Sequence, residues 1–173
     1  MSSTSLAPPA TVWYFAYGSN LDPRTFVGRR RIRPLRSQVG RLPNYQLFFD
    51  LPVGRGERGV ANVRGRPGQH VWGVLYEIGQ REAARLDRTE GVHRGYYRRV
   101  AVEVELQDGG ICGAYTLSSD RGRAGRKPSA RYLGLLLAGS RHHGLPDEWI
   151  ETLRGLELAE DERTRQRELF PRK

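Results

Sequence analysis

The segment from Tyr14 to Leu21 carries the residue types best suited to hold a reacting group. Its apolar, strand-forming first half stops at Gly18-Ser19-Asn20, and Asp22-Pro23 then indicates the start of a helix. Backbone N–H groups at such a strand–loop–helix junction point outward and can hold an anion or a developing oxyanion. Many such junctions are only connections, so this segment alone defines a candidate site and not a function.

Glu90 is the candidate general acid or base. It lies where the predicted helix Gln80–Arg88 gives way to Gly91, with Asp87 one helical turn before it. Composition alone would assign a glutamate in this place to the solvated surface. Asp87 could compete for the same role, although we interpret it as a supporting or structural residue.

Three other patterns suggest different chemistry, and each lacks a required part. Ser19 could be a hydrolase nucleophile, but it lacks the Gly-x-Ser-x-Gly elbow and a convincing histidine partner. The segment Gly54–Gly59 fits the dinucleotide-binding glycine pattern, yet a strand from Val60 follows instead of a helix, which predicts a hairpin loop. The four histidines and Cys112 show no zinc-binding spacing, so neither a metal nor a cofactor is implied.

Several short motifs, taken in their order along the chain, resemble the γ-glutamylcyclotransferase (AIG2-like) family. They extend over most of the sequence, from about Val12 to Leu153, and their shared order makes coincidence improbable. The motifs are Tyr14–Leu21, Val71–Tyr76, Leu86–Val92, Gly95–Tyr97, Ala114-Tyr115, Pro128–Tyr132 and Gly144–Pro146.

The resemblance implies an α+β fold, a small mixed-strand β-barrel flanked by helices, with the active site at a barrel opening. It implies that Glu90 is the catalytic acid and base. It also implies a set of substrate-binding residues, while Trp72 and Tyr115 are expected in the core. The implied binding residues are Tyr14, Tyr17, Gly18, Ser19, Asn20, Leu21, Tyr97 and Tyr132.

The implied reaction is the cleavage of a γ-glutamyl amide by the substrate's own α-amino group, which releases 5-oxoproline and a free amine or amino acid. This intramolecular attack needs no protein nucleophile, because correct orientation supplies an effective molarity of about 10⁵–10⁸ M. One alternative is a biosynthetic enzyme acting on a γ-glutamylated amine or on a γ-glutamyl group bound to an acidic carrier protein. An alternative of another class is a non-catalytic binding domain whose arginines contact nucleic acid.

The charge of the chain bears on these alternatives. Its 173 residues carry 29 basic and 19 acidic side chains, a net charge of +10, and only two of the basic residues are lysines. Seven arginines lie between Arg24 and Arg41. No helix-turn-helix, zinc finger or aromatic RNA-binding motif accompanies them, so we interpret them as a solvated basic surface and rank nucleic acid a distant second.

The sequence predicts one domain, residues 12–156, between two tails. Residues 1–11 are predicted to be disordered, and residues 157–173 to form a charged tail or a surface helix. Strands are expected at 12–17, 45–50, 60–64, 71–78, 97–106 and 111–117, with helices near 23–28, 80–88 and 129–143 and another capped by Asp147. The lone cysteine, the absence of a signal-like start and the shortness of the apolar runs favour a cytoplasmic protein without a membrane span.

Overall fold

The five strands close into a barrel in the order β1-β3-β2-β4-β5, as predicted from the resemblance. The computed structural model describes residues 10–160. The strands are β1 (Thr11–Ala16), β2 (Arg36–Pro52), β3 (Gly59–Gly79), β4 (Arg98–Leu106) and β5 (Ile111–Ser118). The barrel is mixed because β1 runs parallel to β5, meeting it at the pair Tyr14–Tyr115, whereas the other neighbouring pairs are antiparallel.

The long hairpin of β2 and β3 differs from the separate short strands that the sequence predicts. Local turn residues such as Asn44, which has a positive φ of 60°, suggested interruptions. The structure absorbs these residues as register shifts at Pro43/Tyr45 and Phe48/Leu51, and pairing continues beyond them. The glycine-rich segment Gly54–Gly59 joins the two strands, as the hairpin-loop interpretation predicted.

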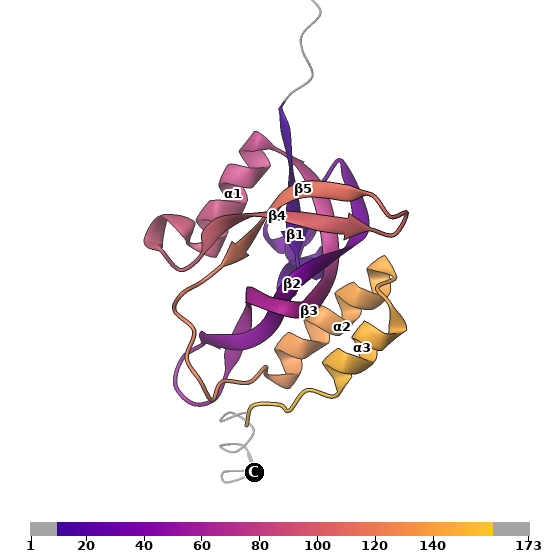
Figure 1. Cartoon of the computed structure of the whole chain (residues 1–173). Helices are drawn as coiled ribbons and strands as arrows, with labels where there is room; N and C mark the ends of the chain where they lie inside the picture. Colours follow the sequence, from indigo (N-terminus) through magenta and orange to yellow (C-terminus); the bar gives the residue numbers. More distant parts are fainter. Residues whose placement is uncertain (1–9, 161–173) are drawn as a thin grey trace, which may run out of the picture.

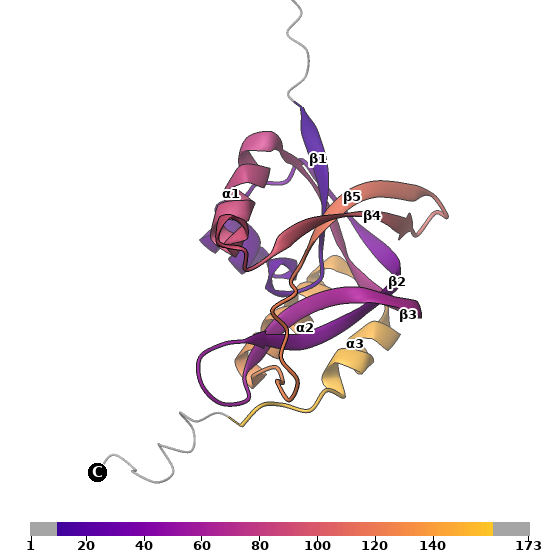
Figure 2. The same ribbon diagram turned by 60° about the vertical axis from the view of Figure 1, so that its left-hand side comes forward.

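Helices cover two sides of the barrel (Figures 1 and 2). Helix α1 (Gln80–Glu90) lies on one side, and α2 (Ala130–His143) packs with α3 (Asp147–Arg154) on the other. Short helical turns occupy Ser19–Leu21 (η1), Arg24–Arg29 (η2) and Val92–Arg94 (η3).

The ends of these helices follow from local residue chemistry. The Ser129 hydroxyl accepts a hydrogen bond from the Tyr132 N–H at 3.1 Å and so caps α2. Gly91 and Gly144 end α1 and α2 in the left-handed conformation, with φ of 71° and 70°. The prediction that Asp147 caps the last helix was wrong, because Pro146 takes the cap position and α3 begins at Asp147.

The core fills the barrel and the spaces under the helices. It combines inward-facing strand residues such as Phe15 and Leu75 with Leu86 of α1 and Leu136 of α2, all fully buried. No helix among residues 10–160 is long and apolar enough to span a bilayer.

The predicted tails lie mostly outside the described residues. Of the predicted N-terminal tail, Thr11 already belongs to β1, and residues 1–9 are not described. Of the predicted C-terminal segment only residues 157–160 are described, and they are not helical. There the Ala159 N–H donates to the Pro128 carbonyl at 2.9 Å.

Candidate active site

The loop after β1 brings Asn20 into the interior, where its side chain connects three other residues. Its amide Nδ2 donates to the Tyr14 hydroxyl at 3.0 Å and to Glu90 Oε1 at 2.9 Å, and its Oδ1 accepts from Arg30 Nε at 2.6 Å. The Asn20 carbonyl accepts from the Tyr76 hydroxyl at 3.1 Å. Asn20 is only 4% exposed, so these hydrogen bonds fix the loop against the barrel.

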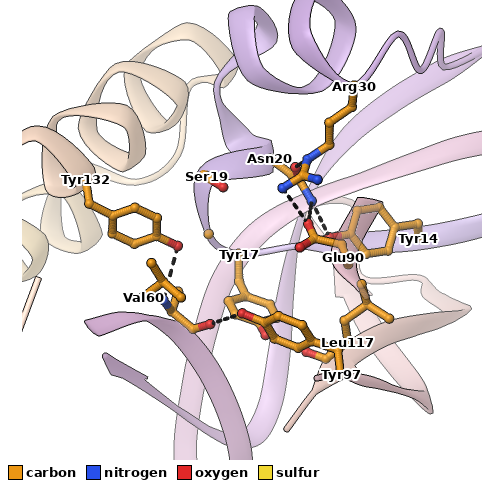
Figure 3. A pocket seen from close by; sticks show the side chains of 12 residues that line it. Tyr14, Tyr17, Ser19, Asn20, Arg30, Val60, Glu90, Tyr97, Leu117 and Tyr132 are labelled. Atoms are coloured by element: carbon orange, nitrogen blue, oxygen red, sulfur yellow. Dashed lines mark hydrogen bonds and ion pairs between the residues drawn. The ribbon is translucent and has the colours of Figure 1, made fainter. Parts of the chain in front are cut away.

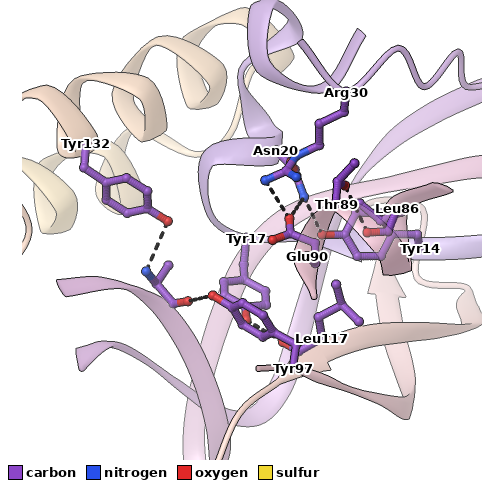
Figure 4. Close-up of polar contacts among 11 residues, drawn as sticks. Tyr14, Tyr17, Asn20, Arg30, Leu86, Thr89, Glu90, Tyr97, Leu117 and Tyr132 are labelled. Atoms are coloured by element: carbon purple, nitrogen blue, oxygen red, sulfur yellow. Dashed lines mark hydrogen bonds and ion pairs between the residues drawn. The ribbon is translucent and has the colours of Figure 1, made fainter. Parts of the chain in front are cut away.

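Glu90 reaches this loop from the last position of α1. Gly91 reverses the chain directly after it, so the carboxylate is held at a helix end beside the barrel opening. Glu90 Oε1 accepts from Asn20 and forms an ion pair with Arg30 at 2.8 Å (Figure 4). Among residues 10–160, the structure records no hydrogen bond to the other oxygen, Oε2. The side chain is 15% exposed, so the carboxylate is partly buried and still accessible.

Arg30 corrects the sequence prediction of a fully solvated basic stretch. Its side chain is only 15% exposed and binds both Glu90 and Asn20. The turn η2 folds back over the loop and directs this arginine inward, while neighbouring Arg29 and Arg31 remain exposed. Arg30 therefore lines the cavity, and the interpretation of the stretch as a solvated surface was wrong for this residue.

Two tyrosines bind the backbone of the same β3 residue, Ala61, one at its N–H and the other at its carbonyl. The Tyr97 hydroxyl donates to the Ala61 carbonyl at 2.9 Å, and the Tyr132 hydroxyl accepts from the Ala61 N–H at 3.1 Å. Tyr17, next to them, donates to the Leu117 carbonyl. These contacts come from β3, α2 and the entrance to β4, so the site depends on the assembled barrel.

Burial dominates the acid–base properties of the site tyrosines. It raises the pKa of Tyr132 to about 12, against hydrogen bonds from Ala61 and Ser19 that favour the phenolate. It also raises the pKa of Tyr14, Tyr17 and Tyr97 well above the usual value, with the Glu90 charge adding to each shift. All four phenols are therefore neutral at physiological pH and can donate hydrogen bonds.

These side chains surround a cavity of about 160 Å³. Figure 3 shows Tyr132 on one side of it and Glu90 on the other, with Ser19 on the loop between them. An apolar cavity of about 150 Å³ accommodates benzene, so this one matches a five- or six-membered ring in size. The full lining is Tyr14, Tyr17, Gly18, Ser19, Asn20, Arg30, Val60, Ala61, Glu90, Tyr97, Leu117 and Tyr132.

Gly18 leaves room for this cavity. A Cβ atom at Gly18 would lie 3.1 Å from both the Ala61 Cβ and the Tyr132 hydroxyl, tighter than nine in ten real Cβ contacts. A side chain here would push the loop away from Tyr132. The sequence identified this glycine as part of the site, and its close approach to the barrel gives a physical reason for it.

Some residues singled out in the sequence lie elsewhere. Leu21, predicted to bind substrate, is fully buried under α2 and does not line the cavity. Asp87 forms an ion pair with Arg99 at 2.8 Å, which agrees with a structural role. Tyr115 is buried in the core, and the partly buried Trp72 packs against this core, as expected. The cavity lining contains no histidine, so no imidazole adjoins Ser19 there.

A second, wider hollow of about 900 Å³ lies at the mouth of the cavity, and we call it the outer hollow. Val60, Glu90 and Tyr97 line both spaces, so Glu90 stands at their junction. The geometry thus combines a small inner cavity for one part of a ligand with a wide space for another part, and a carboxylate between them.

Comparisons with known proteins relate the sequence and the fold to one family. A family model described as the AIG2-like family matches residues 70–153. The chain is 31% identical over 150 residues to γ-glutamylcyclotransferases of Bos taurus and Homo sapiens, which covers 83% of this chain and 78% of each relative. A solved structure named γ-glutamyl cyclotransferase superposes with a TM-score of 0.78 at 27% identity, covering 88% of this chain and 92% of that chain.

A human protein described as uncharacterized superposes with a TM-score of 0.76 at 28% identity, covering 86% of this chain and 89% of that chain. The closed mixed barrel, its helices and the extent of the sequence match all indicate one assignment. The chain belongs to the γ-glutamylcyclotransferase family and is a cyclotransferase of that type.

Proposed function

We propose that the inner cavity binds the γ-glutamyl part of a small substrate and that Glu90 is the general base and acid for its cyclisation. The α-ammonium group gives a proton to Glu90, and the resulting amine attacks the γ-carbonyl carbon. The bond to the leaving nitrogen then breaks as that nitrogen takes the proton from Glu90. The attacking nitrogen still carries two protons after the attack, and it loses one of them to the restored Glu90 carboxylate, which passes it to the released amine or to solvent. The products are 5-oxoproline and a free amine or amino acid.

The observation that supports this proposal best is that the two Glu90 carboxylate oxygens differ in their partners. Oε1 is occupied by Asn20 and Arg30, whereas no hydrogen bond is recorded to Oε2 within residues 10–160. The carboxylate is thus held in place through one oxygen and keeps the other for a proton. Positioning of this kind is the main contribution that an enzyme can make to an intramolecular reaction.

The other residues of the cavity receive binding roles in this proposal. The backbone of Gly18, Ser19 and Asn20 holds either the charged head of the substrate or the oxyanion that develops on the γ-carbonyl. The neutral Tyr97 and Tyr132 phenols orient the substrate from the opposite wall. Leu21, which the sequence placed among the binding residues, supports the loop through packing.

Two further assignments from the sequence remain predictions. A cytoplasmic location agrees with the lone Cys112, which has no partner for an internal disulfide. An acidic carrier protein is a second candidate source of the γ-glutamyl group, because the outer hollow is wide and lined by arginines.

The test is product analysis on a panel of γ-glutamyl dipeptides and γ-glutamylamines, each with an N-acetylated control. We expect 5-oxoproline in equal amount to the released amine, and no turnover of the acetylated controls, because acetylation removes the attacking amine. Release of glutamate in place of 5-oxoproline, or turnover of an acetylated substrate, would show hydrolysis and contradict the proposal.

A further inference from the structure

The outer hollow adjoins the bond that breaks in the proposed reaction. Glu90 lines both the inner cavity and the outer hollow, so a substrate whose γ-glutamyl part fills the cavity extends its other part into the hollow. The residues of the outer hollow therefore face the leaving group. Their chemistry bears on which leaving groups this protein accepts.

Three arginines from the segment after β5 line this space: Arg121, Arg123 and Arg126. Arg121 lies over the Tyr96 ring, 4.8 Å from its centroid, and donates to a backbone carbonyl at 3.2 Å. Arg126 donates to two backbone carbonyls at 3.2 and 3.4 Å. The structure records no hydrogen bond from the Arg123 side chain within residues 10–160. Two of the guanidinium groups are thus oriented by neutral partners, and the third is available.

The carboxylates of the hollow do not balance these charges. Asp120 forms an ion pair with Arg98 at 3.2 Å, and Glu90 forms one with Arg30 at 2.8 Å. Among the described residues, none of the three arginines of the hollow has a carboxylate partner within ion-pair distance. The outer hollow therefore carries an uncompensated positive charge next to the scissile bond.

We propose that the outer hollow selects leaving groups that carry two or more carboxylates, such as an acidic amino acid or a short acidic peptide. A guanidinium group binds a carboxylate through two parallel hydrogen bonds, and three such groups can serve more than one carboxylate. The hollow is wide enough for a residue or two beyond the scissile bond. This inference rests on the proposed function, since it assigns the second half of the same substrate.

The test compares γ-glutamyl-glutamate with γ-glutamyl-glutamine, which match in size and differ by one negative charge. We expect kcat/KM at low ionic strength to be roughly fivefold higher for γ-glutamyl-glutamate, because one additional exposed ion pair contributes up to about 1 kcal/mol, which corresponds to about fivefold. Salt screens exposed charges, so the preference should shrink as ionic strength rises. The preference should also disappear in the variant R121Q/R123Q/R126Q.

A matched control, R66Q/R81Q/R88Q, removes three exposed arginines and so changes the net charge equally. It should keep the preference, because these arginines do not line the outer hollow. The single variant Arg123→Gln guards against misfolding of the triple variant, since no recorded hydrogen bond is lost. It should reduce the preference by about twofold, because Arg121 and Arg126 remain in the hollow.

Three outcomes are informative. Equal kcat/KM for the two dipeptides, with 5-oxoproline released from both, would overturn the inference and leave the proposed function intact. Loss of the preference in the control triple variant would also overturn it, since the general field of the protein would then be responsible. Failure of both dipeptides and of neutral γ-glutamylamines to give 5-oxoproline would refute the proposed function and this inference together.

Discussion

Replacing Arg30 by glutamine should impair the protein in two measurable ways, because this side chain holds Glu90. The change removes the 2.8 Å ion pair to Glu90 and the 2.6 Å hydrogen bond to Asn20. A hydrogen bond to a charged group contributes about 1.5–3 kcal/mol, and breaking a fully buried ion pair costs about 3–5 kcal/mol. Since 15% of each side chain remains exposed, we expect the free energy of unfolding to fall by about 2 kcal/mol.

Activity should fall further than stability alone would explain. A displacement of about 1 Å in a catalytic group can cost about a hundredfold in rate, so we expect a loss of this order in kcat/KM for a small γ-glutamyl substrate. Arg30→Lys should be intermediate, because it keeps the charge and loses the fork that reaches Glu90 and Asn20 together.

The assay is urea unfolding and 5-oxoproline release for Arg30→Gln, with Arg33→Gln as the control. Arg33 is exposed and belongs to the same arginine-rich stretch, so the control matches the charge change. A double-mutant cycle of Arg30→Gln with Glu90→Gln should give a coupling of about 1.5–2 kcal/mol in stability. The reasoning is refuted if Arg30→Gln behaves like Arg33→Gln in both assays, or if the coupling lies below about 0.5 kcal/mol.

Three further predictions concern the elements around the site. A Cβ atom at Gly139 of α2 would lie 2.3 Å from the backbone carbon of Leu21, so Gly139→Ala should lower the free energy of unfolding by about 1–3 kcal/mol and reduce activity. Gly134→Ala should be neutral or stabilising, because a Cβ atom there has nothing within 4 Å. Equal effects of the two variants in urea unfolding would contradict this prediction. Ser19→Ala should keep measurable activity if the loop acts through its backbone, and complete loss together with an acyl-enzyme trapped on the wild-type protein would instead support a serine nucleophile. Burial lowers the pKa of His143, so the unfolded chain binds a proton at this imidazole more readily than the folded protein does. The free energy of unfolding should therefore keep its full value above about pH 6.5 and decline below it. His143→Gln should flatten that decline in unfolding curves measured across pH.

Local patterns predicted much of the secondary structure. The helices predicted at 80–88 and 129–143 stop shortly before Gly91 and Gly144, and these two glycines end α1 and α2 in the left-handed conformation. The strand predicted at 97–106 is β4 (Arg98–Leu106), in which Val102 and Val104 are buried and the residue between them is exposed. Local breakers in β2 and β3 misled the prediction because long-range pairing within the barrel outweighed them, as strand propensity depends strongly on tertiary context.

The barrel itself and the grouping of site residues came from the family resemblance. Glu90 and the loop Gly18–Asn20 lie 70 residues apart in sequence, and no local pattern requires that they meet. Arg30 was missed for a related reason. It is one of seven arginines in a short stretch, and only the fold of η2 distinguishes it from its exposed neighbours.

The most direct test of the central claim is turnover and binding by Glu90→Gln. The amide keeps the volume of the carboxylate and its contact with Asn20, yet it cannot take a proton from the substrate amine. We expect a folded protein that binds a γ-glutamyl substrate within about tenfold of the wild-type Kd and releases 5-oxoproline at least about a hundredfold more slowly, the lower range for loss of general acid–base catalysis. Release at a rate close to wild type would contradict the account and assign the proton transfer to another group.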